Sequence, residues 1–226
     1  MRWVHVPIRP PMRTFVELRN RWKGKRAALL LTGPSLASDE AREAVKTCDV
    51  VFGVHSAWKL FDVDVWTCAT WPNFQEAVGK HHPKVIVAHN SLWGRWKSIP
   101  GDIECYTMNA ADPDRFRDSP TRWEDVFSDD FLSQNLTMRW YTAGAGVYAM
   151  SLAVIGGVSE IIRIGHDGPS SGVMNHDNSK PLDAQKVRDL GIIEDGMNRF
   201  YADWGDRIRL RSVSSTGIGK WPRWKK

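Results

Sequence analysis

Short apolar runs separated by polar, helix-like stretches recur along this 226-residue chain. A run that is apolar at consecutive positions indicates a strand buried on both faces, as in a parallel sheet. The run at 27–31 is apolar throughout, and runs that are largely apolar, with one or two polar residues each, lie at 49–54, 63–68, 84–88, 103–106 and 161–164. Because the intervening stretches suit helices, the pattern predicts an α/β fold, a Rossmann-like, mostly parallel sheet with helices on both faces.

Helices are expected at 38–46, at 147–156 and at about 182–204. The second is rich in small residues, and Gly156-Gly157 ends it. The segment 207–213 alternates charged and apolar residues, which is typical of an edge strand.

The same pattern predicts one catalytic domain over residues 26–216. A basic arm rich in Pro and Trp precedes it (1–25), and a basic tail follows it (217–226). Residues from about 109 to 141 are polar and poor in branched aliphatic side chains, and we expect them to form a lid-like insertion.

Composition narrows the class of protein. The chain is 42% hydrophobic and 25% charged, as in ordinary globular proteins. The sequence has neither an apolar stretch of bilayer length nor a secretory signal pattern, so we expect a cytoplasmic protein without membrane partners. The cysteines, Cys48, Cys68 and Cys105, form no CxxC pair, so we expect neither a disulfide scaffold nor a metal site built on cysteine.

Charge and tryptophan content are unusual. The formal net charge is +5, and 12 residues are Trp. Basic residues gather at both ends of the chain, with Trp22, Trp221 and Trp224 among them. Cations interleaved with aromatic rings suit a nucleic-acid backbone and stacked bases. The alternative is a solvated basic surface on which the tryptophans are packing residues.

Polar residues follow several of the expected strands. Carboxyl ends of parallel strands meet at one edge of a sheet, where ligands bind. In the turn after the first run, Gly33 allows close backbone approach, Pro34 fixes the turn, and exposed amides suit a phosphate. An ordinary strand-to-helix connection is the alternative. The polar strand ends are Thr32 to Ser35, His55-Ser56, Thr70 to Asn73, His166-Asp167 and Ser214 to Thr216.

Two histidines are the acid/base candidates, because imidazole titrates near neutral pH. His166 follows a strand directly, and His176 lies in a polar, glycine-containing loop. Asp167 suits ribose hydroxyls, a metal or a helix N-terminus. No Walker A loop, GxGxxG or HExxH is present.

Taken in order, these motifs resemble the bacterial sialyltransferases of glycosyltransferase family 42. They also resemble the wider sialyltransferase-like superfamily, which includes an archaeal 6-hydroxymethyl-dihydropterin diphosphokinase. The resemblance covers about residues 27–214. It rests on the Gly-Pro-Ser-Leu turn at 33–36, the strand ending near His55, Trp71-Pro72-Asn73-Phe74, and the spaced block from Gly146-Val147-Tyr148 to Gly165-His166-Asp167, followed by a loop with a histidine.

The resemblance implies roles for these residues. Gly33, Pro34 and Ser35 would contact the phosphates or ribose of a nucleotide-sugar donor, Asn73 would bind on the donor side, and Gly146 would line the nucleotide. His176 would be the general base that deprotonates an acceptor hydroxyl, with His166 and Asp167 as further catalytic candidates.

The chain departs from the family pattern within the donor site. Thr32 and His55 stand where the family has Asn, and Gly144-Ala145 stands where it has Thr-Ser. The family's side chains at these positions help to recognise a cytidine-monophosphate sialic acid donor. Their loss argues against sialic acid and for another sugar.

The leading interpretation is therefore a metal-independent glycosyltransferase that uses a nucleotide-sugar. The basic ends favour DNA as the acceptor partner, for example a hydroxylated base flipped out of the duplex. One alternative is a pterin-type diphosphokinase that needs Mg²⁺, for which Asp62, Asp64 and Asp167 are the only carboxylate set. Another is a non-catalytic nucleotide- or nucleic-acid-binding protein. The sequence leaves open whether the chain forms a homo-oligomer.

Overall fold

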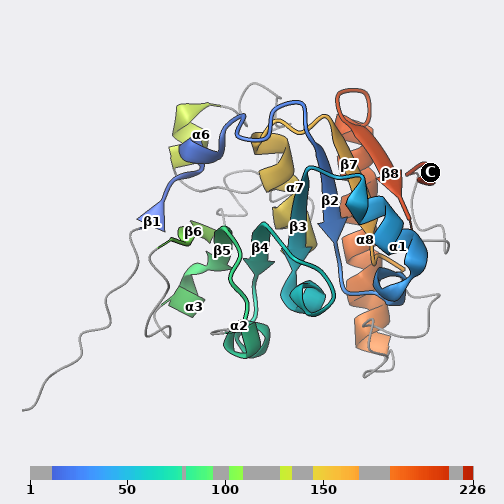
Figure 1. Ribbon diagram of the computed structural model, residues 1–226, viewed down its shortest axis with the longest axis horizontal. Coiled ribbons are helices and arrows are strands. Elements are labelled where there is room, and N and C mark those ends of the chain that lie inside the picture. The colour runs from blue at the N-terminus through green and yellow to red at the C-terminus, as the bar shows by residue number, and fades with distance from the viewer. Residues whose placement is uncertain are drawn as a thin grey trace, which may run out of the picture.

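The centre of the molecule is an eight-stranded sheet in which every pairing is parallel (Figure 1). The computed structural model describes residues 12–77, 80–93, 102–108, 128–133, 145–167, 184–213 and 221–225. The strands are β1 (Met12–Arg13), β2 (Arg26–Leu30), β3 (Val50–Val54), β4 (Val65–Cys68), β5 (Val85–His89), β6 (Glu104–Met108), β7 (Glu160–Ile164) and β8 (Arg209–Ser212). Their order is β1-β6-β5-β4-β3-β2-β7-β8. The expected α/β class is confirmed.

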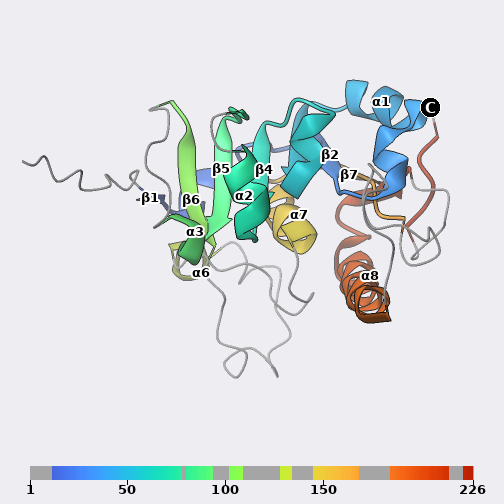
Figure 2. The ribbon, with the colours of Figure 1, turned by 90° about the horizontal axis from the view of Figure 1, so that it is seen from below.

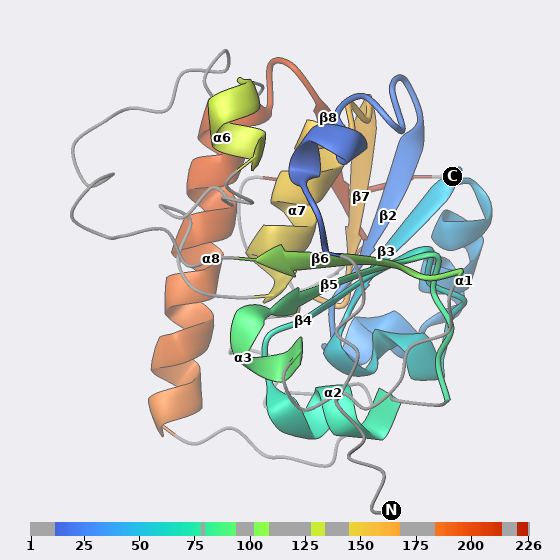
Figure 3. The same ribbon diagram turned by 90° about the vertical axis from the view of Figure 1, so that its left-hand side faces the viewer.

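Helices cover both faces of this sheet (Figure 3). The α-helices are α1 (Asp39–Lys46), α2 (Trp71–Ala77), α3 (Asn90–Trp93), α6 (Asp129–Ser133), α7 (Ala145–Ile155) and α8 (Ala184–Trp204), and the 3-10 helices are η1 (Phe15–Leu18), η2 (Pro34–Ala37) and η3 (His55–Lys59). One core layer contains side chains of α7, α8, α6 and η1, and the other contains side chains of α1, α2 and α3. Figure 2 shows α7 and α8 on the same side of the sheet.

Strand alternation explains the two layers. In β2, Ala27 and Leu29 belong to the α7 layer, whereas Ala28 and Leu30 belong to the α1 layer, because successive side chains of a strand point to opposite faces. The consecutive apolar run of β2 is therefore buried on both sides. Helix α7 is apolar all round, and ten of its eleven residues are buried, as expected for a helix enclosed by the core.

The expected basic arm is not an arm over its described part. Met12 and Arg13 pair with Cys105 and Tyr106 as β1, at one edge of the sheet. Phe15 and Leu18 are fully buried in the α7 layer. The strong basic and Pro-rich composition concealed this short apolar pattern. Residues 12–25 thus belong to the folded domain.

The described part of the expected basic tail, residues 221–225, also packs on the domain. Trp224 donates its backbone N–H to Ser212 O (2.8 Å), and Ser212 donates its own to Pro222 O (2.9 Å), so this segment continues the sheet beyond β8. Trp221 is buried in the α7 layer and Trp224 in the α1 layer. The strand expected at 207–213 is present as β8, the last named strand in the order, and its outer side is paired only at Ser212, by the bridge to Arg223, among the described residues.

Of the insertion expected at 109–141, the structure describes residues 128–133. There Leu132 of α6 is buried, and Arg19, next to η1, forms an ion pair with Asp129. The lid-like character of the whole insertion stays a prediction. Among the described residues, no helix has the length and apolarity required to cross a membrane.

Candidate functional site

The strand order reverses between β2 and β7. From β2 the sheet continues through β3 to β1, and from β7 it continues to β8 on the other side. In open α/β sheets, ligands bind in the crevice outside the carboxyl ends of the strands at such a reversal, because the connecting segments separate there. The turn 32–35 after β2 and the turn 165–167 after β7 lie at this point of the strand order. We call the place where these two turns meet the switch-point crevice.

These two turns are joined by a short series of hydrogen bonds. Gly33 N–H donates to Gly165 O (2.7 Å), and Ser35 N–H donates to Asp167 Oδ2 (2.7 Å). In return, Gly165 N–H donates to Ser35 Oγ (3.2 Å). The fold therefore brings Gly33, Ser35 and Asp167 into contact, as predicted for residues that follow neighbouring parallel strands.

Glycine is required at both turns because the backbones approach closely. A Cβ at Gly33 would lie 2.5 Å from Asp167 Oδ2 and 2.6 Å from Gly165 O. Gly165 has φ +77, and a Cβ there would lie 2.6 Å from Leu31 O. These are contacts that no side chain tolerates without a shift of backbone.

The hydrogen bonds correct the expected amide cradle. The amides of Gly33 and Ser35 donate within the protein, and Pro34 has no N–H to give. The carboxylate of Asp167 lies where we expected a phosphate, so it occupies the Ser35 amide and would repel a second anion. Of the three ligands considered for Asp167, the helix N-terminus is the one observed, since Ser35 lies in the first turn of η2.

His55 lies at the carboxyl end of β3 in the left-handed region, with φ +46. Asn and His both adopt this conformation more readily than most residues, which accounts for one replacing the other at this position. Trp66 Nε1 donates to His55 O (2.9 Å), and Cys68 Sγ lies 3.9 Å from His55 Nδ1. Burial lowers the pKa of His55 to about 4, so the imidazole is neutral at pH 7.

His166 is also buried and neutral. Its side chain is 4% exposed, and neither ring nitrogen has a hydrogen-bond partner among the described residues. Burial, with the nearby charge of Arg163 adding to it, lowers the pKa of His166 to about 3. An imidazole with this pKa is a weak base, so the geometry favours His166 as a neutral hydrogen-bonding group rather than as the general base.

Sequence reasoning missed Arg163, a fully buried cation in β7. Its guanidinium carbon lies 4.5 Å from the centroid of the Trp221 ring, and its Nη2 donates to Ser212 Oγ (3.4 Å). Burial lowers the pKa of Arg163 to about 10, against the opposing effect of Glu194 and Asp167. The signal was a single arginine within the apolar run of residues 161–164, which a buried strand does not otherwise explain.

Helix α7 packs on β2, β3 and β4. Thr67 of β4 donates its hydroxyl to Ala145 O (3.3 Å), which fixes the first residue of the helix. A Cβ at Gly146 would lie 2.6 Å from Leu31 Cδ2 and 3.3 Å from Met197 Cε. Packing against these side chains therefore accounts for the glycine, whereas the resemblance implied contact with a nucleotide.

The remaining site candidates divide between the described and undescribed parts of the chain. Thr32, Pro34 and Asn73 are partly exposed after β2 and β4, and Asn73 Nδ2 donates to Thr70 Oγ1 (2.8 Å). His176 and Gly144 lie outside the described residues. Their roles stay predictions.

Asp64 and Asp167, two of the three carboxylates considered as Mg²⁺ ligands, lie at opposite ends of the parallel strands. Asp64 directly precedes β4, where it accepts from Val51 N–H (3.0 Å) and pairs with Lys84 (2.8 Å). Asp167 follows β7 and so lies at the opposite edge. Within the described ranges, no group of three or more His, Cys, Asp or Glu side chains is placed to hold a metal ion.

Three tryptophans expected to interleave with the basic residues are buried. Trp22 packs edge-on against Phe52, with ring centroids 5.0 Å apart, and Trp221 stacks near Phe200. Trp22, Trp221 and Trp224 are 6–7% exposed. They are packing residues, as the alternative interpretation held, and cannot stack on bases.

Comparison with known proteins supports the fold. Neither a protein-family model nor a curated protein matches the chain. Among solved structures, it is similar to the MAf glycosyltransferase from Magnetospirillum magneticum AMB-1 (TM-score 0.58, 12% identity), over 94% of this chain and 37% of that one. It is also similar to the sialyltransferase CstII from Campylobacter jejuni, solved with cytidine-5'-monophosphate (TM-score 0.49, 15% identity), over 87% and 82% of the two chains.

The chain thus spans little more than a third of the MAf glycosyltransferase. The likeness to the first of these structures shows a shared α/β architecture, so the Rossmann-like fold that the resemblance implied is confirmed. Because one fold hosts many activities, the reaction has to be argued from the site.

Proposed function

We propose that this protein is a glycosyltransferase that moves a sugar from a nucleotide-sugar donor to an acceptor hydroxyl. The observation that carries the proposal is the switch-point crevice, built on a fold shared with a glycosyltransferase. The proposal assigns to this site polar groups that follow separate strands: Thr32 and Ser35 after β2, His55 after β3, Asn73 after β4, and Asp167 after β7.

The donor phosphates need hydrogen-bond donors other than the Gly33 and Ser35 amides. The N-terminus of α7 supplies them in this proposal, because the first amides of a helix have no partner within it and carry partial positive charge. Helix α7 has eleven residues, and its first residue, Ala145, accepts a hydrogen bond from Thr67 in the carboxyl half of β4. His55 and His166 are neutral at pH 7 and would hydrogen-bond the donor without changing its charge.

In the transfer step, the acceptor oxygen forms a bond to the anomeric carbon while the bond from that carbon to the phosphate oxygen breaks. The leaving nucleotide takes the electron pair, and the acceptor proton moves to an imidazole nitrogen of His176. The assignment of His176 rests on the family resemblance and on its place in the sequence after β7.

For the acceptor we propose a hydroxylated base in DNA. The net charge of +5 supports this choice, whereas the buried tryptophans no longer do. The protein would be incubated with hydroxymethylated DNA, plain DNA and a glycan, each with a panel of sugar nucleotides. Transfer to hydroxymethylated DNA alone is expected; transfer only to the glycan would eliminate the DNA acceptor but keep the glycosyltransferase.

The base is tested with His176→Ala against His82→Ala, a matched change at an exposed histidine outside the crevice. The first variant should lose transfer while the donor nucleotide still raises its Tm, because the donor binds the native state only. The second should behave as the parent. Equal transfer by both variants would refute the assignment. Transfer of a diphosphate from ATP to a hydroxymethylpterin, abolished by a chelator, would instead favour the Mg²⁺-dependent diphosphokinase.

A further inference from the structure

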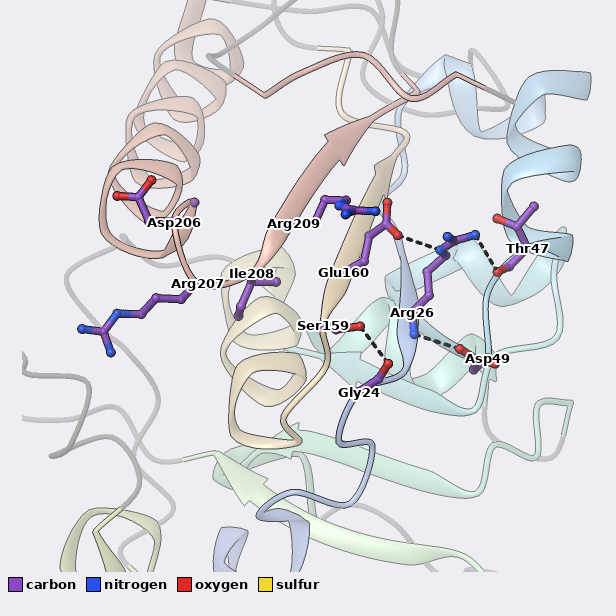
Figure 4. Close-up of a pocket in the computed structure, with 11 residues that line it drawn as sticks. Gly24, Arg26, Thr47, Asp49, Ser159, Glu160, Asp206, Arg207, Ile208 and Arg209 are labelled. Carbon is purple, nitrogen blue, oxygen red and sulfur yellow. Dashed lines mark hydrogen bonds and ion pairs between the residues drawn. The ribbon is translucent and has the colours of Figure 1, made fainter.

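A polar cavity opens at the edge of the sheet opposite the switch-point crevice (Figure 4). It lies at the amino ends of β2, β7 and β8 and has a volume of about 640 Å³. A second cavity of about 240 Å³ shares Arg26, Thr47, Glu160 and Arg209 with it and extends toward Trp224 and Lys225. At 3.3 Å per residue, Glu160 and Gly165 lie about 16 Å apart along β7, so the two cavities are separate from the switch-point crevice.

The strand register builds a row of charges across three strands. Arg26 of β2 is paired with Glu160 of β7, which is paired with Arg209 of β8. Arg211 lies two residues further along β8, on the same face as Arg209. The row is therefore fixed by backbone pairing rather than by flexible loops.

Glu160 holds two of these arginines in place. Its carboxylate is 8% exposed and pairs with Arg26 Nε (2.8 Å) and Arg211 Nε (3.1 Å). Arg26 Nη1 also donates to Thr47 O (3.3 Å) at the end of α1. Both guanidinium groups thus have fixed positions while their remaining N–H groups stay unused by the described residues.

The charges of the smaller cavity do not balance. Four cations line it, and Glu160 is the one carboxylate in that lining, which leaves an excess of three positive charges. The side chains of Arg209 and Lys225 have no hydrogen-bond or ion-pair partner within the described ranges. Gathering cations around one buried carboxylate raises mutual repulsion, which a bound anion would relieve. Guanidinium groups suit phosphate in particular, because their N–H groups match its oxygens in pairs.

We propose that this arginine pocket, formed by Arg26, Arg209, Arg211 and Lys225 around Glu160, is a second ligand site that binds phosphate groups. The phosphate comes either from a phosphorylated small molecule or from the backbone of a nucleic acid. The larger cavity has the volume of a small-molecule site, and the row of arginines along β8 suits successive backbone phosphates. The proposal is independent of the glycosyltransferase activity.

The test variant is Arg209→Ala/Lys225→Ala, which removes the two unpaired cations and leaves the Arg26–Glu160–Arg211 pairs intact. Arg188→Ala/Arg199→Ala is the matched control, since it removes the same charge from exposed positions of α8 that do not line the pocket. Circular dichroism and Tm show whether each variant is folded. The probes are pyrophosphate, by calorimetry, and a fluorescent 12-nucleotide single strand, by anisotropy over a range of salt concentrations.

We expect the test variant to bind pyrophosphate at least tenfold more weakly than the parent, and the control variant to match the parent. For the single strand, losing two phosphate contacts should make the slope of log K against log[salt] shallower by about 1.4. Weakening of pyrophosphate alone would identify a phosphorylated small molecule, and weakening of the single strand alone would identify the nucleic-acid backbone. Unchanged binding of both probes by the test variant would overturn the proposal, including the case in which pyrophosphate binds only in the switch-point crevice. Failure of both probes to bind the parent would also overturn it.

Discussion

Replacing Gly33 with alanine tests the close contact between the two turns of the switch-point crevice. Gly33 has φ −71 and ψ 166, a conformation open to any residue, so the substitution adds no backbone strain. The new Cβ, however, would meet Asp167 Oδ2 at 2.5 Å and Gly165 O at 2.6 Å. One of these atoms is a backbone oxygen in the turn directly after β7, which a side-chain rotation cannot move away, so the turns must separate.

The size of the effect follows from two contributions. Forcing an additional carbon into a packed site costs about 1–3 kcal/mol. Separating the turns also weakens the hydrogen bond from Ser35 N–H to the Asp167 carboxylate, a class of bond that contributes about 1.5–3 kcal/mol. We expect Gly33→Ala to lower the free energy of unfolding by about 3 kcal/mol.

Substitutions at two other glycines distinguish the effect of a steric contact from the effect of backbone conformation. Gly191 lies within α8 with open space around its Cβ position, so Gly191→Ala should stabilise the protein by about 0.5–1 kcal/mol. Gly24 has open space but φ +76, so Gly24→Ala should cost about 1–2 kcal/mol through conformation alone. Urea unfolding followed by Trp fluorescence gives all three values. A free energy of unfolding of Gly33→Ala within 0.5 kcal/mol of the parent value, or a smaller loss than that of Gly24→Ala, would contradict the close contact between the turns.

Three further outcomes follow from buried groups. Lowering the pH from 7 to 5 should reduce the free energy of unfolding by about 2 kcal/mol through His166, because its pKa is about 3 in the folded state and 6.5 in the unfolded state, so that only the unfolded state takes up the proton. Urea unfolding of His166→Asn should lack this contribution, and an equal pH dependence in both proteins would refute it. Trp221→Ala should lower the free energy of unfolding by about 3–5 kcal/mol, and a cost under 1 kcal/mol would show that the ring is not packed on Arg163. Burial raises the pKa of Cys48 to about 11 and of Cys68 to about 12, so iodoacetamide at pH 8 should label either thiol at least ~100-fold more slowly than in the urea-unfolded chain, as measured by mass spectrometry; equal labelling rates would contradict this.

The sheet could be predicted from the sequence because its strands are buried on both faces. Runs such as 27–31 and 161–164 have no helical or alternating interpretation that competes with a buried strand. Strand β1 was missed because two residues carry no period, and its pairing with β6 depends on residues 93 positions away in the chain. Composition was misleading at both ends, where the described tryptophans and phenylalanines supply core contacts between the basic residues.

The meeting of the turns after β2 and β7 could be predicted from the sequence, but its details could not. Parallel strands place Gly33 and Asp167 at one edge whatever the side chains do, so their meeting was foreseeable. That Asp167 accepts the Ser35 amide depends on a distance between two turns, which no local pattern encodes. The arginine pocket was equally hidden, because Arg26, Glu160 and Arg209 become neighbours only through the strand register.

The placement of β7 beside β2 has a consequence for how the chain matures on the ribosome. Strand β2 pairs early with β3, but its other edge must wait for Glu160 to Ile164, about 134 residues later. At 5–20 residues per second, synthesis leaves this side of β2 without a partner strand for roughly 7 to 27 s. During this interval β2 presents unpaired backbone groups to other nascent chains, so we expect yield in cells to depend on chaperone supply and on translation rate more than on the stability of the finished protein.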